Sequence, residues 1–127
     1  MPTAQELPID TSASAEQMAE AIFGNGIEIE SASYTGASSA SGIYSNGDTI
    51  APGVTPSDTG VILSTGRATD FTNSSGSTNT NTSSGRSTSH GTAGDSDLDA
   101  IAGGTTYDAA VFEADFVPEG SNLTMQF

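Results

Sequence analysis

Residues 110–127, AVFEADFVPEGSNLTMQF, decide the fold class of this chain. Apolar side chains alternate there with acidic or polar ones at the period of two that is typical of β-strands. The sequence PEGS at residues 118–121 interrupts the alternation with residues that favour a turn. The pattern predicts a β-hairpin with one apolar face, and the second strand would carry Leu123, Met125 and Phe127 on that face.

Upstream of this hairpin, the sequence predicts two strands and one helix. Residues 27–30 alternate apolar and acidic side chains, as a half-buried strand does. The run VIL at residues 61–63 lies between glycines and is typical of a strand buried on both faces at the centre of a sheet. Ser14 and Gln17 have the spacing of a capping box, which predicts a short helix over 15–23. The expected fold class is therefore mainly β: an antiparallel β-sandwich-like sheet with one short N-terminal helix and a long polar loop.

That loop is expected at residues 72–94, which are almost entirely Ser, Thr, Asn and Gly. The segment has no apolar periodicity from which a core could be built. A polar insertion that the surface tolerates is the simpler interpretation. The alternative is a functional loop or one ordered by an ion, because such a length is uncommon in compact domains.

Length and charge restrict the class of protein. The 127 residues fit one domain with a small core, so 1–127 is expected to be a single β-rich domain. Sixteen acidic residues and only two arginines give a net charge of −14, and this charge repels nucleic-acid phosphates and anionic lipids. The chain also has no apolar stretch of the roughly 20 residues that a bilayer span needs. We expect no nucleic-acid partner and no membrane insertion.

Candidate metal ligands are four aspartates: Asp95, Asp97, Asp99 and Asp108. Carboxylate oxygens at this density suit calcium, which takes about six to eight oxygen ligands. The segment is not an EF-hand, because Ala100 replaces the glycine of that loop's turn and Thr106 stands where its closing glutamate would be. The sequence therefore predicts a calcium site at these aspartates. The alternative is a solvated acidic turn in which aspartates cap backbone amides.

No catalytic machinery is predicted, and a hydrolase is the least favoured function. His90 is the one histidine, and no Gly-x-Ser-x-Gly turn is present to hold a serine nucleophile. Glu113 and Asp115 share a strand face and superficially resemble the paired carboxylates of glycosidases. The chain has no tryptophan that could hold a sugar beside them. We expect this protein not to be an enzyme.

Five segments occur in a characteristic order: Gly24–Ile27, Ala32–Gly36, Gly60–Gly66, Gly94–Leu98 and Phe112–Pro118. This order resembles the choice-of-anchor L domain family of bacterial surface proteins, and the resemblance spans most of the chain. It implies an extracellular or cell-surface location and brings no catalytic residues with it. It also implies that the chain corresponds to the N-terminal part of a longer domain that continues into further strands.

Two functions from different classes are expected on this basis. The first is a non-enzymatic extracellular surface or matrix module of the adhesion type, stabilised by calcium. The alternative is a structural subunit of an extracellular filament, in which the edge formed by Leu123, Met125 and Phe127 exchanges strands with another copy. Expected partners are a protein, the domain's own downstream strands or further copies, with a surface carbohydrate as a further option.

Overall fold

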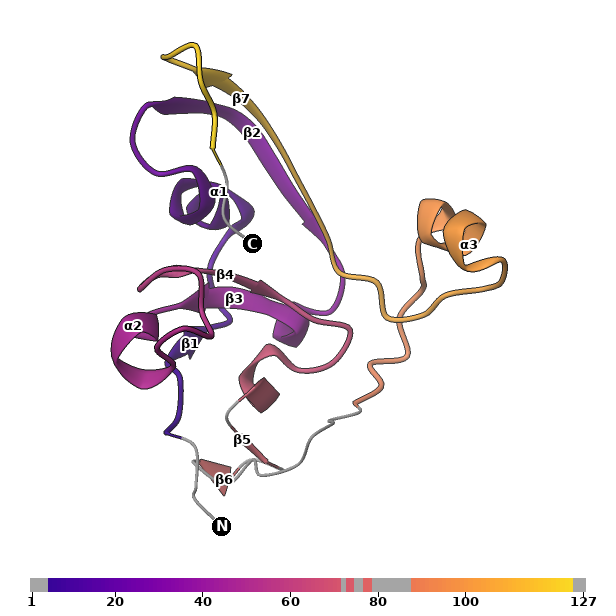
Figure 1. Cartoon of the computed structure of the whole chain (residues 1–127). Helices are drawn as coiled ribbons and strands as arrows, with labels where there is room; N and C mark the ends of the chain where they lie inside the picture. The colour runs from indigo at the N-terminus through magenta and orange to yellow at the C-terminus, as the bar shows by residue number, and fades with distance from the viewer. Residues whose placement is uncertain (1–4, 72, 75–76, 79–87, 125–127) are drawn as a thin grey trace.

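The computed structural model describes residues 5–71, 73–74, 77–78 and 88–124 (Figure 1). The α-helices are α1 (Ala15–Phe23), α2 (Gly47–Ile50) and α3 (Ser96–Ala102), with short 3₁₀ turns at η1 (Ser38–Ala40) and η2 (Ala68–Phe71). The strands are β1 (Ile9–Asp10), β2 (Ile27–Thr35), β3 (Ser41–Tyr44), β4 (Gly60–Leu63), β5 (Asn73–Ser74), β6 (Ser77–Thr78) and β7 (Val111–Pro118). All strand pairs are antiparallel, as expected, but the architecture is mixed α/β and not mainly β.

The longest feature is a two-stranded ribbon of β2 and β7, which run side by side in Figure 1. Residues 111–118 form a strand, as their alternation predicts, and in the described part of the chain it pairs with β2 and not with the predicted hairpin strand, of which residues 125–127 lie outside the described residues. Ile27 pairs with Pro118 and Thr35 pairs with Val111, so the partner strand lies far upstream. Residues 119–124 form no strand, and the amide of Glu119 donates a hydrogen bond to the carbonyl of Gly26 across the end of the ribbon (2.9 Å).

A β-bulge in β2 keeps the apolar side chains of the ribbon on one face. The pairing register shifts between Ile29 and Ser31, which leaves Glu30 without a paired residue on β7. An extra residue in one strand reverses which alternate positions face inward. The half-buried positions therefore change from odd to even numbers after the bulge, and Ala32 and Tyr34 share the face of Ile29. Acidic residues of both strands lie on the opposite, exposed face.

Helix α1 covers the apolar face of the ribbon. It begins at the predicted capping box: the amide of Gln17 donates to Ser14 Oγ (3.2 Å), and the amide of Ser14 donates to Gln17 Oε1 (2.9 Å). The helix packs on β2, and its Met18 is only 1% exposed. The ring of Phe23 lies against that of Phe116 on β7, with 4.4 Å between the centroids. The helix prediction is confirmed over its whole length.

Among the residues that the structure describes, the second sheet has the order β1-β3-β4, so β4 lies at its edge and not at the centre that the sequence predicts. Tyr44 pairs with Gly60, and the tyrosine ring occupies the space that a side chain at position 60 would need, since a Cβ there would lie 2.6 Å from Tyr44 Oη. Helix α1 contacts β3 and β4, so one face of the strand is covered by a helix. Leu63, at the end of the apolar run, remains 43% exposed.

The sandwich prediction is wrong because α1 lies between the ribbon and the three-stranded sheet (Figure 1). The two sheets therefore do not pack face to face. The core is small, as expected, and Met18 is the one large side chain that is fully buried in the described part of the chain. The other buried apolar residues are Leu7, Ala19, Ala40, Tyr44, Ala68 and Ala109.

The polar segment at residues 72–94 is more structured than a plain loop where the structure describes it. Strands β5 and β6 pair with each other through backbone hydrogen bonds, which need no apolar periodicity. Closer to β7, Thr88 Oγ1 donates to Asp70 Oδ2 (2.9 Å), and Ala93 forms a bridge with Tyr107. The expectation for residues 72, 75–76 and 79–87 lies outside the described residues.

Candidate functional site

Helix α3 occupies the segment where the sequence predicts a metal-binding loop. Asp95 is its N-cap, and Asp95 Oδ1 accepts hydrogen bonds from the amides of Asp97 (2.9 Å) and Leu98 (3.3 Å). A carboxylate at this position satisfies amides that have no partner within the helix and interacts favourably with the helix dipole. The signal for a helix was therefore present in the sequence, since an aspartate cap followed by acidic residues in the first turn is a helix start.

Asp99 ties α3 to the segment that follows it. Asp99 Oδ1 accepts hydrogen bonds from the amide (2.5 Å) and the hydroxyl (2.6 Å) of Thr106. These bonds, the hydroxyl first, hold the pKa of Asp99 below its ordinary value. The backbone of Thr106 also lies so close to Gly94 that any side chain at position 94 would collide with the Thr106 carbonyl and hydroxyl oxygens.

Asp108 fastens the end of the polar segment to the start of β7. It adopts a left-handed conformation (φ 54°), which aspartate tolerates better than most residues, and it is only 8% exposed. Its carboxylate accepts hydrogen bonds from the amides of His90 (3.0 Å) and Thr92 (2.8 Å) and from Thr92 Oγ1 (3.1 Å). The pKa of Asp108 is lowered, mainly by the backbone amide of Thr92 and then by that of His90.

The structure does not bring the four candidate calcium ligands together. Within the described residues, no group of three or more histidine or acidic side chains is arranged to hold a metal ion. Asp95, Asp99 and Asp108 each accept hydrogen bonds from nearby amides, and Asp97 lies in the first turn of α3. These bonds fit the capped acidic turn that was the alternative interpretation. Calcium binding at the four aspartates stays a prediction.

The predicted interface at the C-terminal end is described only in part. Leu123 is exposed and lies outside any strand. Met125 and Phe127 lie outside the described residues, so the structure does not test their role in an interface.

Of the residues weighed for hydrolysis, Glu113 and Asp115 line one hollow on the ribbon, and His90 is not part of the described lining of that hollow. The Nε2 atom of His90 is enclosed and has no hydrogen-bond partner in the described part of the chain. Glu113 and Asp115 lie on the exposed face of the ribbon, where Asp115 Oδ2 accepts a hydrogen bond from Ser31 Oγ (3.0 Å). A hydrolase stays the least favoured of the predicted functions, and these positions do not test it.

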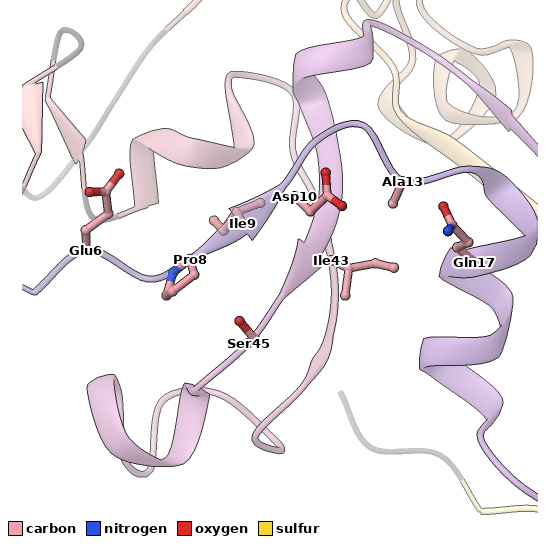
Figure 2. Close-up of a pocket in the computed structure, with 8 residues that line it drawn as sticks. All are labelled: Glu6, Pro8, Ile9, Asp10, Ala13, Gln17, Ile43 and Ser45. Atoms are coloured by element: carbon pink, nitrogen blue, oxygen red, sulfur yellow. The ribbon is translucent and has the colours of Figure 1, made fainter.

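A hollow of about 650 Å³ lies between β1, β3 and the start of α1 (Figure 2). Its carboxylates, Glu6 and Asp10, lie apart from each other in the figure. Asp10 Oδ1 accepts hydrogen bonds from the hydroxyl (2.6 Å) and the amide (2.9 Å) of Ser12, and these bonds lower its pKa. Gln17 is held by the capping box of α1. Asp10 and Gln17 therefore take part in hydrogen bonds of the local fold.

The most distinctive surface is apolar and lies beside α3. Four of the exposed large apolar residues line one hollow of about 660 Å³, here called the α3 hollow: Leu63, Leu98, Ile101 and Tyr107. Helix α3 buries none of its residues and stands away from both sheets in Figure 1. The interpretation of the segment as a metal loop overlooks this surface, although Leu98 and Ile101 have the spacing of one helix face.

A second hollow, here called the α1 hollow, has a volume of about 880 Å³ and lies between α1, β4 and β7. Its apolar lining includes Phe23, Tyr44, Val61 and Phe112. Both hollows are lined by aliphatic, aromatic and small polar residues, without a carboxylate, histidine or arginine among the described lining residues, and such a lining can bind side chains.

In the described part of the chain, no helix is both long and apolar enough to cross a bilayer. Comparison with curated proteins and with solved structures finds no match. Among the family models, the model of the Choice-of-anchor L domain matches residues 6–127. Because this match covers nearly the whole chain, the protein belongs to the choice-of-anchor L domain family.

Proposed function

We propose that this protein is a non-enzymatic extracellular module of the adhesion type, which works by contact with other macromolecules at the bacterial surface. Membership in the family implies a module of a surface or anchored protein. The observation that carries the finer proposal is the exposed apolar lining of the α3 hollow.

This lining differs from ordinary scattered apolar exposure. Ile101 is 84% exposed and Tyr107 71% exposed, and both face the same hollow as Leu98. Contiguous apolar surface of this kind, bordered by polar residues, is typical of interaction sites. Asp97 and Asp99 lie in the first turn of α3, next in sequence to Leu98, which lines the hollow. The surface therefore favours binding to a protein that offers an apolar centre.

The charge of the chain supports a role outside the cell in which the module stays dispersed until it meets its partner. A net charge of −14 opposes association of copies with each other and with anionic polymers. A mutual repulsion of this kind weakens as salt increases. Binding to a partner should therefore depend on apolar complementarity. The partner surface around the apolar contact should be neutral or basic.

Two measurements on the source bacterium test this proposal. Antibodies against the module should label intact cells as strongly as permeabilised ones, and cells that produce Ile101→Asp should attach less to surfaces or to one another than cells with the natural protein. Val54→Asp is the matched control, because Val54 is 67% exposed but lines neither hollow. Labelling that requires permeabilisation, or equal attachment for both variants, would contradict the proposal.

A further inference from the structure

We propose that the outer edge of β4 receives an extended segment of another protein, one that carries apolar side chains at alternate positions and no acidic residue. This inference rests on the proposed function as a contact module, and it specifies where the contact is made and what kind of chain makes it.

The first observation is that β4 is an open edge. The sheet order is β1-β3-β4, and within the described residues no strand pairs with the side of β4 that faces away from β3. An edge strand presents unpaired amide and carbonyl groups that can accept another strand. Natural edges are commonly protected by charged residues or proline, but residues 60–63 are Gly-Val-Ile-Leu.

The second observation is that both apolar hollows meet at this strand. Leu63 lines the α3 hollow and the α1 hollow, and Val61 lines the α1 hollow on the same side of the strand. Neighbouring hollows beside one edge suit an added strand, whose side chains alternate and need pockets at every second position. A compact ligand would use one hollow and would gain nothing from the open backbone edge.

The third observation concerns charge. In a chain with sixteen acidic residues and two arginines, neither hollow is lined by a charged side chain of the described residues. The hollow beside β1 contains Glu6 and Asp10, and the one on the outer face of the ribbon contains Glu113 and Asp115. A carboxylate buried in an uncharged hollow would lose its hydration without compensation. The incoming segment should therefore be free of acidic residues where it meets β4.

The acidity of the remaining surface favours a different protein, and not a second copy of this chain, as the source of that segment. Two copies of this chain would each bring a net charge of −14, and their repulsion opposes pairing at this edge. A different protein with a neutral or basic segment avoids this repulsion. Lysine or arginine at either end of the segment would add attraction to the acidic surroundings.

Binding of a synthetic peptide tests the proposal. The probe is a seven-residue peptide of alternating valine and threonine with lysine at both ends, and the matched probe has aspartate in place of the central valine. Titration into the isotopically labelled chain should shift the amide resonances of residues 60–63 and of both hollows and should slow hydrogen exchange at the open edge. The aspartate-containing peptide should bind at least about tenfold more weakly, which corresponds to about 1.4 kcal/mol.

A variant and its control locate the contact. Leu63→Asp should reduce the affinity for the first peptide at least about tenfold, whereas Val117→Asp should leave it unchanged, because Val117 has a similar exposure (46%) and lines neither hollow. Circular dichroism and the melting temperature check that both variants fold. If Leu63→Asp does not fold, Ile101→Asp replaces it, since that side chain is exposed to solvent and lines the α3 hollow.

Three results would overturn the inference: no saturable binding at the solubility limit of the peptide, resonance shifts that avoid β4, or a peptide-free dimer that Leu63→Asp dissociates. The last result would assign the edge to a second copy. If cells with Ile101→Asp lose attachment and the peptide does not bind, the proposed contact at the β4 edge is rejected. The proposed adhesion function is then still supported. Peptide binding with normal attachment supports the edge and rejects adhesion.

Discussion

Two regions of this molecule are held together by different forces. The α1 region, in which α1 covers the β2–β7 ribbon, is held by apolar contact: Met18 is buried, and the rings of Phe23 and Phe116 touch. The α3 region, residues 88–110, has almost no buried side chains and is held by the carboxylates of Asp99 and Asp108. Most apolar side chains of α3 and its surroundings remain exposed to solvent, whereas the α1 region buries part of its apolar side chains and leaves the rest to line the α1 hollow.

The difference shows how a small chain can expose apolar surface and still fold. Burial of apolar area in the α1 region supplies stability that does not depend on the direction of the contacts. Hydrogen bonds to aspartates fix the α3 region without covering Leu98, Ile101 or Tyr107. The four predictions that follow challenge this division, from the largest expected effect to the smallest.

Truncation of the buried methionine should be the most damaging change. Met18→Ala leaves a cavity between α1 and the sheets, and such substitutions cost about 2–5 kcal/mol of the free energy of unfolding. This is a large part of the roughly 5–15 kcal/mol of a typical domain. Urea denaturation measures the loss. Val54→Ala, at an exposed position, should change stability by less than about 0.5 kcal/mol. Equal effects of the two variants would contradict the view that apolar burial holds the α1 region together.

Acid should loosen the α3 region before the α1 region. The pKa values of Asp99 and Asp108 are lowered in the folded protein from an ordinary value of 3.8. Their hydrogen bonds therefore contribute stability that is fully present well above pH 3.8 and is lost as the pH falls through the lower folded pKa values. Hydrogen exchange measured below about pH 4 should show protection lost first in residues 88–110.

Asp108→Asn supplies the matched test of this pH effect. The variant should already be less stable at neutral pH, and its stability should depend less on acid than that of the natural chain. Asp97→Asn, which removes a charge from the same region but leaves the bonds of Asp108 in place, is the control. Simultaneous loss of protection in both regions would show that they unfold as one unit.

Removal of the helix cap tests the α1 region more gently. Ser14→Ala removes the acceptor of the Gln17 amide and should cost about 1 kcal/mol, within the range of about 0.5–2 kcal/mol for such caps. Ser14→Asp should retain most of the stability, because aspartate is an equally good cap. Thermal unfolding followed by circular dichroism distinguishes the two. A loss of the same size in both variants would mean that the hydroxyl is not what starts α1.

Calcium should have the smallest effect. If the predicted site at Asp95, Asp97, Asp99 and Asp108 binds the ion, calcium at a concentration equal to its Kd stabilises the native state by about 0.4 kcal/mol. The melting temperature should then rise with added calcium, and Asp97→Asn should remove most of the gain. Magnesium at equal ionic strength controls for screening of the charge. A melting curve that millimolar calcium leaves unchanged would rule out the site.

Local signals in the sequence predicted local structure well. The spacing of Ser14 and Gln17 located α1, and the alternation in residues 111–118 located β7. The alternation could not identify the partner of β7, because a period of two describes which side chains share a face and is silent about which strand lies beside them. The turn residues 118–121 favoured the nearest candidate strand, whereas the partner is β2.

The other errors have a common physical origin. The run of Val61, Ile62 and Leu63 suits a strand covered on both faces, but a helix can provide one of the covers as well as a sheet can. Closely spaced aspartates suit both a cation and a helix start. In each case the residues determine what kind of contact they can make. The position of segments that are distant in the sequence determines which group makes that contact.

The bulge in β2 allows the ribbon only one alignment. Ser31 and Asp115, which are joined across it, are 84 positions apart in the chain, so the ribbon can close only after the segment between its two strands has been made. A slip of one residue would turn Glu28 from the exposed face of the ribbon to the face that α1 covers, and would bury a carboxylate without a partner. The bulge and the acidic residues of the exposed face therefore disfavour pairing of β2 and β7 in a shifted register.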